Sequence, residues 1–268
     1  MYKSNPLVDS SARLHESVSL GIGVILQGKC YLEAGVDVGP GAVLDAGEAV
    51  MVVESAVRIG AGAVIGMPVK ISQGAHILPG TVVTRDVPPH AVVSGNPAQI
   101  IGYTTRIRMD AELQSENAPQ EAGVRATSVL GVTFHRLPKI LDLRGNLTVG
   151  EFERSIPFLP RRYFMVFDVP NSEIRGEHAH RTCHQFLICV HGSCAVMVDD
   201  GNTREEVVLD DPSLGLHLPS MTWGVQYKYS SAAVLLVFAS EYYDPEEYIR
   251  DYDEFLALTG RRVSGDGA

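Results

Sequence analysis

Apolar residues recur every six positions through the first third of the chain. A large aliphatic residue opens each hexad, and a small or β-branched residue follows four positions later. The large set is Leu14, Leu20, Leu26, Leu32, Val38, Leu44, Val53, Ile59, Ile65, Ile71, Ile77 and Val83, and the small set is Val18, Val24, Cys30, Val36, Ala42, Val57, Ala63, Val69, Ala75 and Thr81. Neither an α-helix, with a period of 3.6 residues, nor an open strand, with a period of two, produces a strict six. The repeat predicts a parallel β-helix whose coils bury both positions.

Glycines separate the short predicted strands, at Gly21, Gly39, Gly60 and Gly66. Glycine supplies the permissive backbone that tight turns between strands require. The repeat is interrupted once, between Leu44 and Val53, where three additional residues enter the sequence.

This pattern resembles the hexapeptide-repeat acyltransferases, which fold as left-handed β-helices. The resemblance runs from about Leu14 to Gly102 and ends in the segment VPPHAVVSGNPAQIIG. It implies a trimer with acyl-coenzyme A, such as acetyl-CoA, between neighbouring β-helices. In members that acylate amino sugars a protruding loop helps to form the acceptor site, whereas the interruption here is only AGEAVMVV.

Three histidines are candidate bases for such a transfer, His15, His76 and His90. Each is also explained as a solvated or interface histidine, and His76 should face outward because it follows the inward Ala75. Two interpretations of this region stay open: an acyltransferase, or a domain that sets the oligomeric state.

Length and composition bound the remaining alternatives. A chain of 268 residues is comfortable for two domains, and its formal charge of −10 argues against a nucleic-acid partner. No apolar run is long enough to span a bilayer and the N-terminus lacks a signal pattern, so we expect a cytoplasmic protein without a membrane partner. The four cysteines lack CxxC spacing and are expected to be buried free thiols.

The hexad pattern ends near residue 102, and residues 103–128 read as a polar linker that begins as a short helix. Residues 129–268 then show many short alternating segments separated by turns, which predict an all-β sandwich or barrel. Asp199-Asp200-Gly201 is a hairpin signal, and the acidic, aromatic tail predicts a helix packed on the barrel. The expected strands are LTVGEF, RYFMVFDV, HQFLICV, SCAVMVDDG, EEVVL, LGLHLP, WGVQYKY and AVLLVFAS.

The densest group of titratable side chains in this region is RGEHAHRTCHQ, residues 175–185. His178 and His180 are two positions apart on a predicted strand, so both side chains point to the same side. Arg175 offers a forked donor for phosphate or carboxylate, and Gly176 permits a sharp turn of the backbone. His184, His191 and His217 are interpreted as strand or turn histidines rather than catalytic ones.

The cluster resembles the first motif of the cupins, which places these histidines in a jelly-roll barrel. Gln185 occupies the position of the motif's glutamate, and Gly224 stands where the second motif has a histidine. Two histidines, an amide and a glycine make a poor site for zinc or iron. We therefore expect no metal, and expect histidines that move protons.

A narrower resemblance, over residues 129–258, is to the dTDP-hexose 3,4-ketoisomerases. It rests on the blocks DLRGNLTVGEF, PFLPRRYFMVFDVP, RGEHAHRTCHQFLICVHGS, DDG and YIRDYDEFL. It implies conversion of dTDP-4-keto-6-deoxyglucose to a 3-keto-6-deoxyhexose through an enediol, within deoxyamino-sugar biosynthesis and without a cofactor. His180 is the predicted principal base and His178 its partner, in an order that could be reversed. The predicted substrate-binding residues are Arg175, Arg144, Arg162, Tyr163, Gln185 and Trp223.

The alternatives to the isomerase are a bifunctional protein or an acyl-CoA-dependent N-acyltransferase acting on a dTDP-amino sugar, and a cupin that only binds sugar nucleotide. β-Helices of this type form trimers and cupins of this family form dimers. The two symmetries together predict a homo-oligomer, up to a hexamer.

Overall fold

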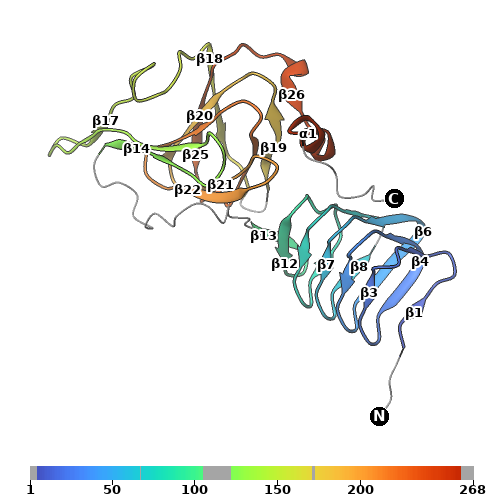
Figure 1. The fold of residues 1–268 in the computed structure, drawn as a ribbon. Coiled ribbons are helices and arrows are strands. Elements are labelled where there is room, and N and C mark those ends of the chain that lie inside the picture. Colours follow the sequence, from blue (N-terminus) through green and yellow to red (C-terminus); the bar gives the residue numbers. More distant parts are fainter. Residues whose placement is uncertain (1–4, 67, 105–121, 171–172, 261–268) are drawn as a thin grey trace. The chain divides into compact units, whose positions relative to one another are not determined.

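The computed structural model describes residues 5–66, 68–104, 122–170 and 173–260. The chain forms two compact units, Met1–Thr104 and Thr105–Ala268, and each is described by itself (Figure 1). Most of the expected linker falls on residues 105–121, which lie outside the described residues. Within the described part of the chain, no helix combines the length and apolar character needed to cross a bilayer.

The first unit consists of short strands connected by turns. Its strands are β1 Leu7–Val8, β2 Arg13–Leu14, β3 Ser19–Leu20, β4 Ile25–Leu32, β5 Asp37–Val38, β6 Val43–Val53, β7 Arg58–Ile59, β8 Val64–Gly66, β9 Lys70–Ile71, β10 His76–Ile77, β11 Val82–Val83, β12 Ala91–Ser94 and β13 Gln99–Tyr103. All pair in parallel except β13, which returns antiparallel along β12.

The pairing register shows a three-sided parallel β-helix. Leu7 pairs with Ile25, and Ile25 with Val43, so one coil takes 18 residues, or three sides of six. β4 and β6 each extend over two sides and bend at a glycine of positive φ, Gly28 and Gly47. The three additional residues form an outward bulge within β6, and they lengthen that coil to 21 residues, because Val43 pairs with Val64.

The two predicted inward positions of each hexad line the interior of the β-helix. From Val24 onward every member of both sets is buried. The exception to the prediction is Leu14, which is 39% exposed, while Val18 and Leu20 are half-buried. These residues lie in the first described coil, where stacking neighbours cover one side only.

The second unit is built from antiparallel strands and one short helix. Its elements are β14 Gly123–Ala126, β15 Thr133–Arg136, β16 Lys139–Ile140, β17 Leu147–Thr148, β18 Arg162–Phe167, β19 Arg175–His180, β20 Gln185–His191, β21 Cys194–Asp199, β22 Arg204–Leu209, β23 Leu214–Leu218, β24 Trp223–Tyr227, β25 Val234–Ala239, the 3₁₀ turn Pro245–Glu247, β26 Tyr248–Ile249 and α1 Tyr252–Leu258.

Two sheets of these strands pack face to face as a jelly-roll barrel. One sheet has the order β14-β15-β23-β20-β25-β18 and the other β22-β21-β24-β19-β26. The core between them is aliphatic, with Leu187, Val196, Val198, Leu216 and Leu235 among its buried members. The predicted β21–β22 hairpin and tail helix are both present, and all four cysteines are buried and free, as expected.

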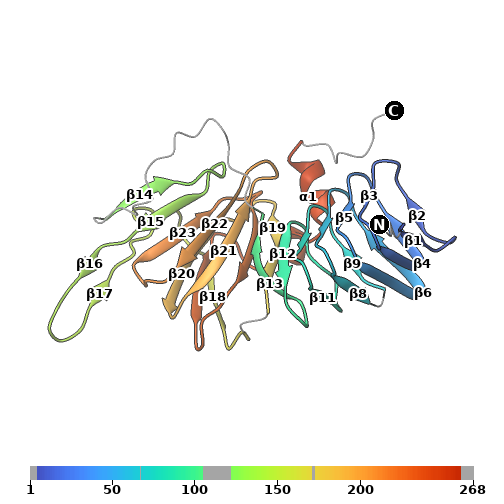
Figure 2. The same ribbon diagram turned by 90° about the horizontal axis from the view of Figure 1, so that it is seen from below.

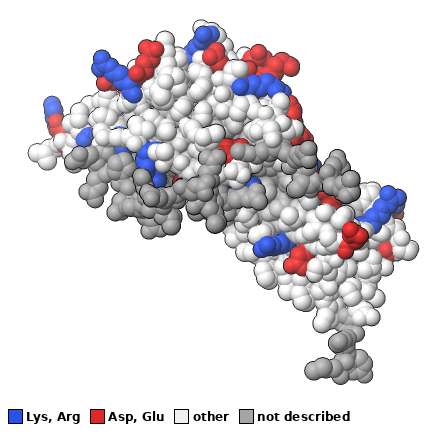
Figure 3. Space-filling view, in the orientation of Figure 1, with Lys and Arg blue, Asp and Glu red and all other residues white. Residues whose placement is uncertain are grey.

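The prediction that LTVGEF is a barrel strand is wrong. Only Leu147–Thr148 is extended, and it pairs with β16 in a separate two-stranded arm, residues 139–149. Figures 1 and 2 show this arm projecting away from the barrel sheets. Its apolar residues Leu141, Leu143 and Leu147 are exposed, and Figure 3 shows positively and negatively charged side chains at this end of the unit as well. Alternation of residues identifies a strand but not the strand with which it pairs.

A glycine substitution tests the close stacking of the coils. A Cβ added at Gly60 would lie 2.4 Å from the backbone nitrogen of Pro79, so Gly60→Ala should destabilise the β-helix by about 1–3 kcal/mol. At Gly66 an added Cβ meets no described heavy atom within 4 Å, so Gly66→Ala is the matched control. Calorimetry should show a lower transition temperature for the Gly60 variant alone, and equal transitions would contradict the stacking argument.

Candidate active site

β19 carries the histidine pair and lies between β24 and β26 in the five-stranded sheet. His178 pairs with Gly224 and His180 with Tyr248, so both histidines face the barrel interior, as the spacing predicted. A bulge at Glu177, whose φ is 54°, separates the pairs Gly176–Val225 and His178–Gly224.

Gly176 is required by its surroundings as well as by its conformation. Its φ is 88°, and an added Cβ would lie 2.6 Å from the carbonyl oxygen of Gly224. Any other residue would be strained and would push β19 away from β24. The glycine therefore holds the strand of the histidines against its neighbour.

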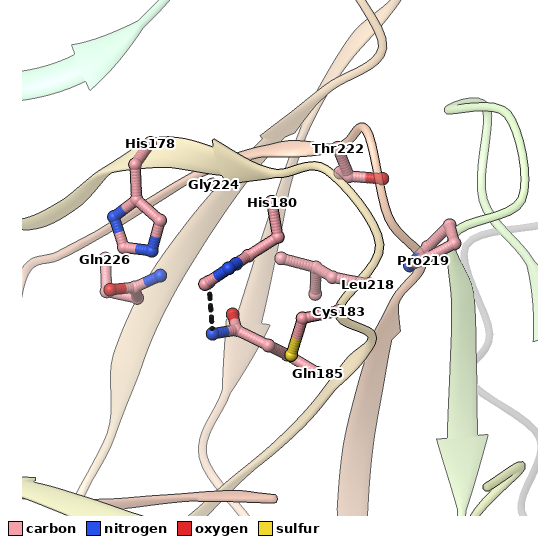
Figure 4. A pocket seen from close by; sticks show the side chains of 9 residues that line it. All are labelled: His178, His180, Cys183, Gln185, Leu218, Pro219, Thr222, Gly224 and Gln226. Atoms are coloured by element: carbon pink, nitrogen blue, oxygen red, sulfur yellow. Dashed lines mark hydrogen bonds between the residues drawn. The ribbon is translucent and has the colours of Figure 1, made fainter. Parts of the chain in front are cut away.

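A small pocket opens beside the two histidines (Figure 4). Figure 4 shows His178, His180, Gln185 and Gln226 directed toward one space. The pocket is lined by His178, His180, Cys183, Gln185, Leu218, Pro219, Thr222, Gly224 and Gln226.

His178 is fixed as one tautomer by the backbone. Its Nδ1 lies 2.9 Å from the carbonyl oxygen of Gly176, which can only accept, so Nδ1 carries the proton. Nε2 then keeps a free lone pair in the neutral ring. Burial lowers the pKa of His178, and the nearby guanidinium of Arg250 lowers it further, so the ring is neutral near pH 7.

His180 is 4% exposed, and burial is the main reason that its pKa falls to about 4. His178 and Arg162 lower the pKa further, whereas the carboxylate of Glu247 opposes them. Its Nε2 lies 3.0 Å from Nε2 of Gln185, and its Nδ1 is buried without a hydrogen-bond partner among the described residues.

The amide of Gln185 controls which nitrogen of His180 carries the proton. With the amide nitrogen toward the ring, His180 Nε2 accepts and Nδ1 is protonated. A half-turn of the amide would present its oxygen, place the proton on Nε2 and free the Nδ1 lone pair as a base. Gln185, predicted to contact substrate, thus lies in the pocket as expected and contacts the histidine itself.

Two residues of the site were not identified from the sequence, Tyr248 and Arg250. The Tyr248 ring centroid lies 4.9 Å from that of His178 and 4.4 Å from that of His180. Arg250 lies over the Tyr248 ring at 4.3 Å, and Nη2 of Arg162 donates to the Tyr248 hydroxyl at 3.4 Å. The block YIRDYDEFL carried the signal, but only the pairing of β26 with β19 shows what it contacts.

Four other predicted substrate-binding residues lie on β18, β19 and β24. Arg175 is at the exposed start of β19, and Arg162 begins β18 beside Tyr248. Tyr163 is 65% exposed on the outer face of β18. Trp223 is buried against Tyr252 and Phe255, because alternation along β24 directs Gly224 and Gln226 into the pocket and Trp223 away from it.

Arg144 is not brought near the histidines of its own chain. It lies in the turn of the arm, almost fully exposed, and its guanidinium pairs with Asp142 at 2.7 Å. Figures 1 and 2 show this turn far from β19.

The cupin positions do not fit a metal in this chain. Gln185 supplies an amide that contacts His180 rather than an open site, and Gly224 supplies no side chain. Among the described residues there is no group of three or more His, Cys, Asp or Glu side chains arranged to hold a metal ion.

A separate chain of histidines crosses the outer face of the six-stranded sheet. The carbonyl oxygen of Ser155 accepts from His135 Nδ1 at 2.9 Å, so His135 Nε2 accepts from Thr133 Oγ1 at 2.8 Å. Thr133 Oγ1 then accepts from His217 Nδ1 at 3.4 Å, and His217 Nε2 accepts from His184 Nδ1 at 3.1 Å. Burial and the two neighbouring histidines lower the pKa of His217 to about 4. His135 binds the segment around Ser155 to the sheet, and the interpretation of His184 and His217 as noncatalytic histidines stays a prediction.

Comparison with known proteins decides the family of the second unit. The sequence model of the FdtA family, described as WxcM-like, C-terminal, matches residues 130–260. The TDP-4-oxo-6-deoxy-α-D-glucose-3,4-oxoisomerase of Aneurinibacillus thermoaerophilus is 44% identical over 117 residues, which are 44% of this chain and 84% of that protein. The chain belongs to the FdtA family of 3,4-ketoisomerases. It is an isomerase.

A solved 3,4-ketoisomerase from Helicobacter canadensis is 35% identical, with 48% of this chain and 98% of that chain covered and a TM-score of 0.47. The β-helix unit is similar to a different protein, the 2,3,4,5-tetrahydropyridine-2,6-dicarboxylate N-acetyltransferase of Staphylococcus aureus strain JH9. That relative is 40% identical over 78 residues, which are 27% of this chain and 33% of the acetyltransferase.

The histidine chain of the ketoisomerase unit makes its stability depend on pH. The pKa of His217 is lowered from 6.5 to about 4 in the folded state, so the unfolded chain binds a proton more readily between those values. Unfolding free energy should therefore fall as pH drops from 6.5 toward 4, by about 1–3 kcal/mol for this histidine.

Urea unfolding at pH 7.5 and at pH 5 checks this dependence. His217→Leu should show a smaller loss between the two pH values than the wild type. His191→Leu, at an exposed position, should keep the wild-type loss. An unchanged pH dependence in the His217 variant would contradict a buried, neutral His217.

Proposed function

We propose that this ketoisomerase acts on a TDP-linked 4-keto-6-deoxyglucose and forms the TDP-linked 3-keto-6-deoxyhexose, with His180 and His178 transferring the protons. The observation that carries the proposal is the pair of neutral histidines, His180 buried and His178 half-buried, facing one pocket. The substrate is supported by the oxoisomerase that is 44% identical over 117 residues, which are 84% of that protein. The reaction belongs in this proposal to deoxyamino-sugar biosynthesis.

The reaction moves a carbonyl between neighbouring carbons. A base must remove the proton on C3 to give an enediolate, and a proton must then reach C4. A neutral histidine is suited to both steps, because it accepts a proton and becomes an acid within one turnover. Nε2 of His178 keeps a free lone pair. Nδ1 of His180 has no hydrogen-bond partner among the described residues, and it becomes a base once the Gln185 amide presents its oxygen to Nε2.

Arginines around the pocket would hold the anionic substrate. Arg175 and Arg162 lie at the start of β19 and of β18, and guanidinium groups bind phosphate oxygens through paired donors. Arg144, on its projecting arm, could contact a substrate only in another subunit. Binding of the diphosphate would raise the low pKa of His180 toward the working pH, because a nearby anion favours the imidazolium.

Deuterium exchange tests the isomerase directly. Incubation with TDP-4-keto-6-deoxyglucose in deuterated water should replace the C3 proton and yield the 3-keto product. His180→Asn should reduce the rate of C3 proton exchange and the rate of product formation by about 10²–10⁴-fold, the usual contribution of a general base. His178→Asn is the paired variant, and a larger loss there would make His178 the base.

The pH profile of the same assay supplies a control. Because burial keeps His180 neutral to about pH 4, exchange with the free enzyme at low substrate should not fall between pH 7.5 and 5.5. An acidic limb near pH 6.5, or wild-type exchange in the His180 variant, would contradict the assignment.

The barrel has an apolar surface that suits a second copy of the chain. Tyr163, Met165 and Phe167 are exposed along the edge strand β18, and the leucines of the arm are exposed as well. Water contact with so much apolar surface is unfavourable, so a dimer through the barrels is the proposed assembly. Trimerisation of the β-helices would then give a hexamer.

Analytical ultracentrifugation measures this assembly. The wild type should sediment as a hexamer, and Met165→Asp should yield trimers by breaking the barrel contacts alone. A monomeric wild type would contradict both contacts.

The N-acyltransferase alternative is less favoured than the isomerase. The bulge of β6 is short, and the acetyltransferase relative is matched over a third of its length. His15 is exposed, while His76 is half-buried in register with Arg58 and Val92. Binding of acetyl-CoA by the β-helix unit stays a prediction.

A further inference from the structure

We propose that Gln226 is a catalytic residue of this isomerase, and that its side-chain amide donates a hydrogen bond to the negatively charged oxygen of the enediolate. The inference rests on the proposed isomerisation and adds a residue of β24 that the sequence did not single out. It is drawn from three observations. The amide is directed into the pocket of the histidines, it lies between two glycines, and it has no hydrogen-bond partner among the described residues.

Gln226 reaches the pocket because of its register on β24. It pairs with Arg175, while Gly224, two positions earlier, pairs with His178. Side chains two positions apart share one face of a strand, and directly paired residues share one face of a sheet. Gln226 therefore lies on the face that carries His178, and Figure 4 shows its amide beside the His178 ring.

Two glycines make room for this amide. A Cβ added at Gly176 would lie 2.9 Å from Oε1 and 3.0 Å from Nε2 of Gln226, and one added at Gly224 would lie 3.6 Å from Nε2. Because Gly224 has no side chain, the space opposite His178 is open. The Gln226 amide borders this space, where the reacting carbons of the sugar meet the histidine.

The reaction creates a negative charge inside the pocket. When the bond between C3 and its hydrogen breaks, its electron pair forms the C3–C4 double bond. The carbonyl electrons move to O4, and the proton goes to a histidine nitrogen. The substrate lacks this charge, so a donor directed at O4 stabilises the transition state more than it stabilises the bound substrate. An amide provides this donor and itself neither gains nor loses a proton.

The other described groups that line the pocket are less suited to this role. None of them is a lysine or an arginine. The amide of Gln185 is turned to His180. The Cys183 thiol donates to a backbone carbonyl oxygen, and Figure 4 shows the Thr222 hydroxyl directed away from both rings. Gln226 is left with two N–H donors for the substrate.

Two substitutions of similar size test the donor. Gln226→Met keeps the length of the side chain and removes both N–H groups, whereas Gln226→Glu keeps its shape and replaces the donor with a charged acceptor. The matched controls are Gln99→Met and Gln99→Glu, at an exposed position of β13 in the other unit. NMR in deuterated water with TDP-4-keto-6-deoxyglucose measures the rate of C3 exchange and the rate of product formation over a range of substrate concentrations. Circular dichroism checks that each variant is folded.

The donor predicts a loss in kcat rather than in binding. Gln226→Met should lower both rates at saturating substrate by about 10²–10³-fold, the usual cost of removing an oxyanion donor, and should change KM by less than about threefold. Gln226→Glu should be slower still at pH 7.5, because a carboxylate repels the enediolate. The Gln99 variants should keep the wild-type rates.

The pH profile of the glutamate variant adds a second readout. A protonated carboxyl group carries one O–H donor, so the rates of Gln226→Glu should rise as the pH falls from 7.5 to 5.5, by up to about tenfold per pH unit. Gln226→Met has no group to protonate at this position and should show no such rise.

Three outcomes would overturn the assignment. Wild-type rates in Gln226→Met would show that the donor is not needed. A higher KM with an unchanged kcat would make Gln226 a residue that only binds the substrate. Equal rates of the glutamate and methionine variants at every pH would show that no charge develops beside the side chain. Failure of the proposed function is distinguishable from these results, because the wild type itself would then neither exchange C3 nor form product, and the assignment would be lost with it.

Discussion

The site depends on the burial of two imidazole rings on one strand that is paired on both edges. β24 and β26 hold β19 in a register that directs both rings into the barrel, and Gly176 allows β24 to approach closely. Burial keeps the rings neutral, because desolvation disfavours the imidazolium. A neutral histidine can accept a proton from carbon, so the packing of the sheet determines the chemistry available to it.

Polar contacts then give each polar group of the site a separate role. The backbone at Gly176 fixes the tautomer of His178, and the Gln185 amide governs that of His180. Tyr248 brings a hydroxyl, and Arg162 and Arg250 bring positive charge beside it. The same sheet face therefore presents bases, a neutral donor and cations to one small space, without the donor set that a cupin metal would require.

The β-helix unit follows a simpler constraint, since a coil of 18 residues buries its apolar side chains only by stacking on its neighbours. The hexad period predicted which residues are buried, and it failed only in the first coil, at Leu14. The period is visible in the sequence because each side of a coil contacts residues at a fixed separation. In the barrel, strand positions were predicted about as well, but not their partners, so the arm was mistaken for part of a sheet.

The sequence by itself determined the β-helix, the all-β second unit and the shared face of His178 and His180, because these depend on local periodicity and alternation. The tertiary structure decided which distant residues join the pair. Tyr248 is 68 positions from His180 and contacts it only through the register of β26. Trp223 points away from the pocket, and Arg144 lies on the arm, away from the pocket. Such contacts depend on strand pairing between remote segments, which no local pattern specifies.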